Sequence, residues 1–360
     1  EDLGFIDNLV NIYFPWANSS NNVLKTPIIA ISEQICFEKE ELFRTIFQEM
    51  IQNSIRHKFG EFYTPPALAK NMIAEVYNFN DRILDPACGS GIFLIELINK
   101  IMESNSPTQE KINAINNLYG MDVNPLAVIL TRINILSLIH TYFNTKPKFD
   151  EFEILSHIYL HDALNITQKH QRTKKSIPVA SLYHGFDLIL GNPPWLTIRD
   201  IQDYTYKKQL KTLASTLEIY RGGKHSPHNE LAAIFFYQIP KLYLKPNGII
   251  FCILSAGLET GEQHAKFRMF RQFKDVFLWK FRDDVFQVRH ICLGAIFHPK
   301  MKSNKNSFQK QIQTTFWTVK HSNEDWNFIK EKQEIYVPYN LNSLEDDQGA
   351  KRLISKSVLN

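Results

Sequence analysis

The chain has 360 residues, of which 44% are hydrophobic and 22% charged, and its formal net charge is +4. This composition is ordinary for a soluble globular enzyme, and the weak basicity permits a polyanionic partner without demonstrating one. No signal peptide opens the chain and no uninterrupted apolar run is long enough to span a membrane, so we expect no membrane association. The four cysteines lack the paired spacing of a zinc site, which indicates free thiols in a reducing cytosol and no metal. Residue 1 is Glu rather than Met, and we expect the chain to be a piece of a larger polypeptide.

Residues 1–58 mix apolar and charged residues in a helical rhythm, and we predict a helical N-terminal region without chemistry of its own. From Gly60 onward, short apolar strands alternate with amphipathic helices, which is typical of a parallel sheet covered on both faces. Thr64, followed by Pro65 and Pro66, predicts the start of a helix with the threonine as its cap.

The alternation continues to about residue 300. The predicted helices cover 67–77, 92–102, 126–139 and 230–244, with Pro240 expected to kink or shorten the last one. The predicted strands cover 82–85, 118–122, 186–190, 249–254, 276–281 and 291–298. No helix separates the last two strands, so we predict an antiparallel hairpin at the edge of the sheet. We therefore predict three parts of the chain: the helical N-terminal region over 1–58, a catalytic domain over 59–300, and a C-terminal extension over 301–360.

A glycine-bearing turn over Asp85–Gly91 joins a predicted strand to a helix. Such a turn lets the backbone approach a ligand at the positive end of the helix, although alone it fits many nucleotide folds. Asp122 ends the next strand, and a carboxylate at that place suits the two hydroxyls of a ribose.

The run Asn192–Trp195 reads Asn-Pro-Pro-Trp and ends another predicted strand. An amino group attached to an aromatic ring is a poor nucleophile, because its lone pair is delocalised into the ring. The Asn192 side chain and a backbone carbonyl fixed by proline offer two acceptors that would localise the lone pair on nitrogen. Trp195 offers a flat surface on which an unpaired base can stack.

Two basic stretches, 168–178 and 199–229, interrupt the alternation after predicted strand ends, where ligands bind in open α/β sheets. We interpret the first as a solvated loop rather than a DNA contact. The second is expected to be mobile without DNA and to close over an extruded base.

Five elements occur in one order, and together they resemble the gamma class of adenine-specific DNA methyltransferases found in type I and type IIG restriction–modification proteins. These elements are Gly60–Pro66, Asp85–Gly91, Asp122, Asp162 and Asn192–Trp195. The resemblance covers about residues 55–300. It implies an α/β fold with a Rossmann-like sheet that has helices on both faces. It also implies methyl transfer from S-adenosylmethionine to the exocyclic amino group of adenine.

The resemblance also implies a role for each element. The residues implied to bind the cofactor are Tyr63 and Thr64 at its methionine end, Asp85, Ala87, Gly89 and Gly91 as its cradle, Asp122 at the ribose, Asp162 at the adenine amino group, and Asn192. The residues implied to act on the target base are Asn192, Pro193, Pro194, Trp195 and Phe286. Phe286 is the loosest of these matches, because the family usually has Pro-Gly where this chain has Gln287-Val288.

Other interpretations stay open. The glycine turn could be purely structural, Trp195 and Phe286 could be ordinary core aromatics, and Asp162 could be a surface carboxylate. The same Asn-Pro-Pro chemistry also serves cytosine N4, RNA or protein glutamine, and the chain could be a non-catalytic module of a defence complex. The expected partners are double-stranded DNA with a flipped adenine, a specificity domain or subunit starting in 301–360, and a nuclease outside this chain. The expected location is the cytoplasm of a bacterium or archaeon.

Overall fold

A computed structural model of the chain describes eight segments. They are residues 64–143, 152–165, 179–219, 230–282, 285–286, 288–299, 312–322 and 325–336. The predicted helical region over 1–58, Tyr63 and the basic loop over 168–178 lie outside the described residues.

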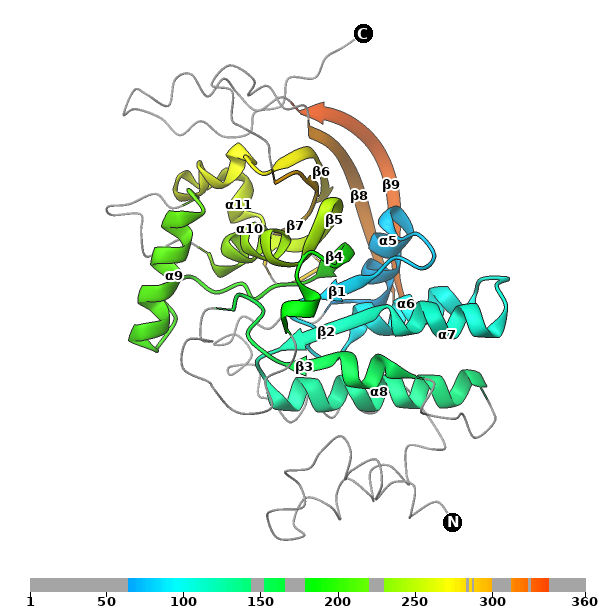
Figure 1. The fold of residues 1–360 in the computed structure, drawn as a ribbon. Coiled ribbons are helices and arrows are strands. Elements are labelled where there is room, and N and C mark those ends of the chain that lie inside the picture. Colours follow the sequence, from blue (N-terminus) through cyan, green and yellow to red (C-terminus); the bar gives the residue numbers. More distant parts are fainter. Residues whose placement is uncertain are drawn as a thin grey trace.

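The described residues form a nine-stranded sheet with the order β3-β2-β1-β4-β5-β7-β6-β8-β9 (Figure 1). The first five strands in this order are parallel, and β7 runs antiparallel to both of its neighbours. The strands are β1 Ile83–Asp85, β2 Leu118–Asp122, β3 Ile158–Leu160, β4 Phe186–Gly191, β5 Leu244–Ser255, β6 Phe273–Phe281, β7 His290–Phe297, β8 Ile312–Ser322 and β9 Asp325–Tyr336.

The strand order changes direction at β1. The strands β2 and β3 lie on one side of it, and β4 and β5 lie on the other, while all five run parallel. Connections that leave β1 and β4 therefore diverge to opposite sides, and the crevice between them opens at the carboxyl ends of these strands. Asp85 ends β1 and Gly191 ends β4. The topology alone brings the two predicted motifs to this crevice.

Helices cover both faces of the sheet (Figure 1). The α-helices are α5 Pro66–Val76, α6 Ile92–Met102, α7 Thr108–Asn116, α8 Pro125–Phe143, α9 Tyr204–Thr216, α10 Leu231–Tyr243 and α11 Gly257–Thr260. Short 3-10 turns are η3 Glu153–His157, η4 Val179–Leu182, η6 Glu262–His264 and η7 Phe267–Met269. The buried residues of α5 to α8 belong to one hydrophobic cluster, and those of α9 and α10 belong to a second.

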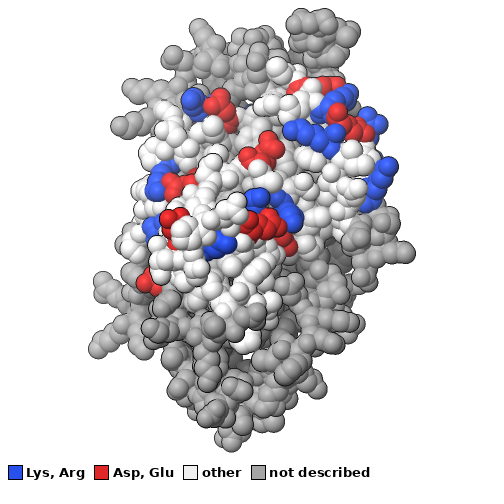
Figure 2. All heavy atoms as spheres, turned by 90° about the vertical axis from the view of Figure 1, so that its right-hand side faces the viewer, with Lys and Arg blue, Asp and Glu red and all other residues white. Residues whose placement is uncertain are grey.

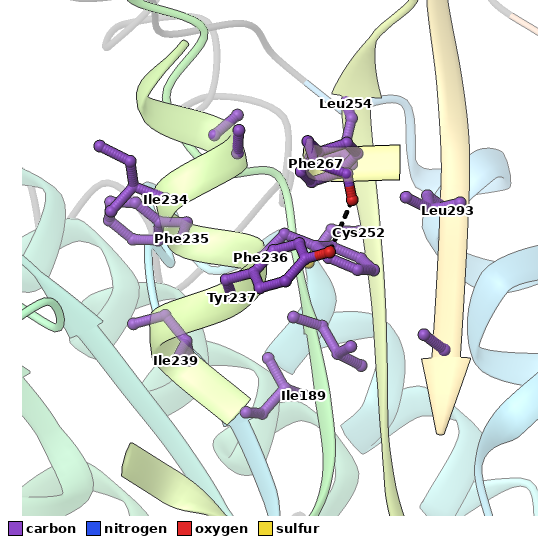
Figure 3. Packing of buried hydrophobic residues seen from close by; sticks show 14 of the residues in the cluster. Ile189, Ile234, Phe235, Phe236, Tyr237, Ile239, Cys252, Leu254, Phe267 and Leu293 are labelled. Atoms are coloured by element: carbon purple, nitrogen blue, oxygen red, sulfur yellow. Dashed lines mark hydrogen bonds between the residues drawn. The ribbon is translucent and has the colours of Figure 1, made fainter. Parts of the chain in front are cut away.

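The second cluster centres on α10, which is apolar on nearly all sides because it lies between the sheet and other elements. Figure 3 shows Phe236 and Tyr237 of α10 beside Cys252 of β5. The Tyr237 hydroxyl donates to the carbonyl of Phe267 at 2.6 Å, so the polar atom of this buried ring is satisfied. This packing fixes β5 beside β4.

The predicted α/β sheet is confirmed, and α6 and β2 have the predicted bounds. Three local details differ from the predictions. Pro240 does not shorten α10, which runs through it to Tyr243, because the proline lies in the last turn and its carbonyl still accepts from Leu244 N. Strand β5 begins at Leu244 rather than at the predicted residue 249, and its pairing with β4 shifts register near this start. Thr64 does not cap α5, whose N-cap is Pro65 without a side-chain hydrogen bond.

The predicted antiparallel pair is present, but it is not the edge of the sheet. β7 lies between β5 and β6, and β6 pairs in parallel with β8 on its other side. The long antiparallel pair β8–β9 then continues the same sheet. The described part of the predicted C-terminal extension therefore adds two strands to the catalytic sheet.

One described helix, α8, has the length and apolar composition of a membrane span. Six of its residues are buried, and Arg132 interrupts its apolar sequence to donate to the carbonyl of Ile158 at 2.6 Å. The helix contacts α6, β2 and β3, and about one third of its apolar window is buried. On the face of the molecule seen in Figure 2, positive and negative side chains are intermixed.

Candidate active site

The glycine turn after β1 has the conformation that its residues demand. Gly89 and Gly91 have φ of +55° and +89°, in the left-handed region that glycine tolerates best. Gly91 is the N-cap of α6, and a β-carbon there would lie 2.9 Å from Thr131 Cγ2. A β-carbon at Gly89 would meet no heavy atom of the described residues within 4 Å. The backbone at Gly89 is therefore open on the side from which a ligand approaches.

Residues of two other elements hold the turn in place. Thr131 and Asn134 of α8 donate to the carbonyls of Gly89 and Ser90 at 2.7 and 2.9 Å. Gly89 N donates to Asp122 Oδ2 at 2.9 Å, which joins the turn to the end of β2. Thr131 and Asn134 were not among the residues predicted from the sequence. Their one available signal was a spacing of three residues on a helix, which places them on one face.

Asp85 is almost fully buried at the end of β1, with 2% of its surface exposed. Its Oδ1 accepts a hydrogen bond from Ala87 N at 3.2 Å. Burial, with a smaller contribution from the negative charge of Asp122, raises the pKa of Asp85 to about 8. Burial disfavours the ionised form of this carboxyl group. A positively charged ligand bound beside it would favour the ionised form and would itself be stabilised by the negative charge.

Asn192 follows β4 directly and reaches the segment before α5. Its Nδ2 donates to Thr64 Oγ1 at 3.3 Å, across 128 positions of sequence. Thr64 is itself buried. The bond directs the amide nitrogen toward Thr64, so the amide oxygen faces another direction as an acceptor. Two residues that the resemblance places at different parts of the site are thus in direct contact.

Trp195 lies in an aromatic cluster at the end of β4. Its indole Nε1 donates to the carbonyl of Ile253 at 3.3 Å. The Phe286 ring lies edge-on to Trp195, with ring centroids 5.2 Å apart at 71°. Phe286 therefore lies beside Trp195, but it is also buried in the hydrophobic core, and its contact with a base stays a prediction.

The sequence analysis missed His290, which begins β7 and completes this cluster. Its ring is nearly parallel to Trp195, with centroids 6.5 Å apart, and perpendicular to Phe286 at 4.7 Å. Burial lowers the pKa of His290 to about 4, so the imidazole is neutral at physiological pH. His290 belongs to no local sequence motif. It reaches the site through the pairing of β7 with β5, which local sequence does not reveal.

Asp162 follows β3 and is held on both carboxylate oxygens. Leu164 N donates to Oδ1 at 3.0 Å, and the Tyr206 hydroxyl donates to Oδ2 at 3.4 Å. Tyr206 belongs to α9, within the stretch 199–229 that was expected to be mobile. Residues 199–219 of this stretch include α9, whose Leu210 is fully buried, and residues 220–229 lie outside the described residues. Its closure over an extruded base stays a prediction.

Cys88 lies within the glycine turn but has no nucleophilic character. Burial, helped by the negative charges of Asp122 and Asp85, raises the pKa of its thiol well above the ordinary value. Cys88, Cys252 and Cys292 are all free and buried. Burial likewise raises the pKa of the Cys252 and Cys292 thiols, so all three stay protonated at physiological pH.

Comparison with known proteins identifies the family of the chain. The family model described as N-6 DNA Methylase matches residues 40–268. The "Type I restriction enzyme MjaIX methylase subunit" of Methanocaldococcus jannaschii is 29% identical over 110 residues, covering 29% of this chain and 19% of the relative. The "Type II methyltransferase M.VspI" of Vibrio sp. strain 343 is 25% identical over 156 residues, covering 42% of this chain and 29% of the relative. The matches therefore span less than a third of these relatives.

Among solved structures, a DrdV–DNA complex matches with a TM-score of 0.55 at 16% identity, covering 79% of this chain and 32% of that one. This likeness supports the fold. Because the family model spans more than half of the chain, the chain belongs to the N-6 DNA methylase family.

Proposed function

We propose that this chain transfers a methyl group from S-adenosylmethionine to the exocyclic amino group of adenine in DNA. The observation that carries the proposal is the contact between Asn192 and Thr64 at the carboxyl end of β4. It directs the amide nitrogen toward Thr64, so that the amide oxygen faces away from this bond. Membership of the N-6 DNA methylase family supports the same chemistry.

The described residues fit this cofactor. A β-carbon at Gly89 would meet no heavy atom of the described residues within 4 Å, and the Asp85 carboxyl is buried at the start of the same turn, at the end of β1. Val123 directly follows Asp122 and is 68% exposed, and Leu160 at the end of β3 is 53% exposed. Exposed apolar side chains at neighbouring strand ends offer a surface for a purine ring. When bound, S-adenosylmethionine supplies an electrophilic methyl group.

The residues of this chain then have distinct tasks. Asp85 and the glycine turn would form the cradle of the cofactor. Asp122 would bind its ribose, and Asp162 would accept from its adenine amino group. Thr64 would position Asn192 and border the methionine end. Tyr63, which the resemblance also assigns to that end, lies outside the described residues.

At the target base, the Asn192 oxygen and the carbonyl of Pro193 would accept both N–H bonds of the amino group. This keeps the lone pair on nitrogen and stabilises the positive charge that develops there during transfer. Pro193 is buried and Pro194 follows it, so the backbone that presents the carbonyl is rigid. Trp195 would stack on the extruded base, with Phe286 against its edge.

We further propose that the chain works as the modification part of a restriction–modification or phage-defence protein in a bacterial or archaeal cytoplasm. Its partners would be double-stranded DNA, a specificity domain or subunit, and a nuclease outside these residues. The relatives support this context by their names, which are those of a type I methylase subunit and a type II methyltransferase.

The test is transfer of tritiated methyl from S-adenosylmethionine to DNA that carries the parent protein's recognition site. Digestion of the product to nucleosides should give N6-methyladenine. N4-methylcytosine would redirect the proposal to the other amino base. No transfer in the presence of measurable cofactor binding would favour the non-catalytic alternative.

A further inference from the structure

The contact between Tyr206 and Asp162 joins helix α9 to the proposed binding place of the cofactor adenine. Asp162 lies after β3, at the place proposed for the adenine of the cofactor. Tyr206 lies on α9, which follows the Asn-Pro-Pro-Trp element that is proposed to act on the base. The hydroxyl of Tyr206 donates to Asp162 Oδ2 at 3.4 Å.

From this contact, and resting on the proposed function, we infer that Tyr206 is a positioning residue of the cofactor site. It would fix the Asp162 carboxylate for the purine amino group and would join α9 to that end of the cofactor.

Both oxygens of the Asp162 carboxylate accept hydrogen bonds. The last torsion of an aspartate side chain is broad, so a single hydrogen bond leaves the carboxylate free to rotate. Leu164 N holds Oδ1 of Asp162, and Tyr206 holds Oδ2, so together they set its plane. Each oxygen of an ionised carboxylate has two lone pairs, so accepting from Leu164 N and Tyr206 does not by itself prevent Asp162 from accepting from a purine amino group.

Tyr206 is held both at its backbone and at its hydroxyl group. Its backbone N–H donates at 2.7 Å to Asp203, the N-cap of α9. One turn further along the helix, Leu210 is fully buried in the core and anchors α9 against the sheet. Burial and the charge of Asp162 raise the pKa of the Tyr206 phenol, so the hydroxyl stays protonated as a donor.

The helix also provides a matched control. Tyr204 lies two residues before Tyr206 and is 79% exposed, on the side of α9 that faces away from the core. Replacing either tyrosine with phenylalanine removes one hydroxyl from the same helix and keeps the ring. Only Tyr206→Phe removes a donor to Asp162.

The experiment measures calorimetric affinity of the full chain for S-adenosylhomocysteine and for S-inosylhomocysteine, whose purine carries an oxygen in place of the amino group. Tyr206→Phe should weaken binding of S-adenosylhomocysteine by roughly three- to tenfold, the worth of one net hydrogen bond. It should leave binding of S-inosylhomocysteine nearly unchanged, because that ligand has no amino group for Asp162 to accept. Tyr204→Phe should bind both ligands like the parent chain.

A double-mutant cycle with Asp162→Ala completes the test, since Tyr206 should have no effect once its partner is absent. If Tyr206→Phe discriminates the two ligands like the parent, or if its effect adds to that of Asp162→Ala, the inference is overturned and the proposed function stands. If Asp162→Ala itself binds S-adenosylhomocysteine normally, the proposed place of the purine is wrong and the inference falls with it. An equal loss for both ligands in Tyr206→Phe would mark a purely structural residue and also overturn the inference.

Discussion

The carboxylate of Asp85 lies directly against the backbone of Gly191, so closely that a β-carbon at residue 191 would come within 2.8 Å of Asp85 Oδ1. These residues end the neighbouring parallel strands β1 and β4. The proposed cofactor cradle and the proposed catalytic element therefore meet at one contact, with no side chain between them. A change at either residue reaches both parts of the site.

Gly191→Ala should disturb this contact. Asp85 is buried and bonded to Ala87 N, so it has little room to retreat from an added methyl group. We expect a loss of about 1–3 kcal/mol in the free energy of unfolding, typical of overpacking, and a weaker affinity for S-adenosylmethionine. Urea denaturation and calorimetry measure the two effects. Parent-like stability and affinity would show that the crevice is looser than this contact indicates.

The raised pKa of Asp85 predicts a pH dependence of stability. Its pKa is about 8 in the folded chain, against an ordinary value of 3.8, so the folded state binds the proton more tightly than the unfolded state. The stabilisation is fully present below about pH 4 and is lost as the pH rises through about 8. The melting temperature of the ligand-free chain should therefore fall from pH 6 to pH 9 more steeply than that of Asp85→Asn. Parallel profiles of the two proteins would contradict this prediction.

The same group predicts proton release when the cofactor binds. S-adenosylmethionine carries a positive sulfonium, which favours the ionised form of Asp85 and lowers its pKa. Affinity should therefore rise with pH up to about 8, by at most about tenfold per pH unit, and level off above it. Calorimetry in two buffers of different ionisation enthalpy measures the released proton directly. Binding by Asp85→Asn should be weaker, and proton release from this site should be absent.

Asn192→Ala removes an acceptor that matters most as positive charge develops on the target nitrogen. Single-turnover methyl transfer should slow by roughly a hundredfold or more, similar to the loss of one oxyanion-hole donor, while cofactor affinity changes little. Thr64→Val keeps the amide but removes its orienting partner, and should slow transfer by a smaller factor, roughly tenfold. A parent rate in Asn192→Ala would reduce the Asn-Pro-Pro-Trp run to a structural turn.

Trp195→Ala should weaken capture of the extruded base by roughly 1–3 kcal/mol, the usual worth of one base–aromatic stack. Trp195→Phe should recover most of this loss, because stacking needs the ring face more than the indole N–H that bonds to Ile253. Fluorescence of 2-aminopurine at the target position reports extrusion without requiring methyl transfer. If Trp195→Phe behaved like Trp195→Ala, the Ile253 bond rather than stacking would be the essential contact.

Local pattern was enough to predict the frame of this protein. The extent of α6 and β2 follows from apolar periodicity and from the glycine and aspartate that bound them. The placement of Asp85 and Gly191 at one edge of the sheet follows as well, because parallel strands bring their carboxyl ends together. Family membership rests on a match over one continuous stretch, residues 40–268.

Contacts between distant segments could not be predicted in this way. Thr64 looks like a helix cap, since a threonine before two prolines has that local preference, but its hydroxyl accepts from Asn192 instead. His290 reaches Trp195 through strand pairing, and Tyr206 reaches Asp162 through the docking of α9. The sequence by itself determined six of the described strands, four of the helices and the motifs at their ends, because these depend on neighbouring residues. The elements β3, β8, β9, α7, α9 and α11 were not predicted. Only the tertiary structure decided which side chains support those motifs, because their partners lie far away along the chain and are selected by packing.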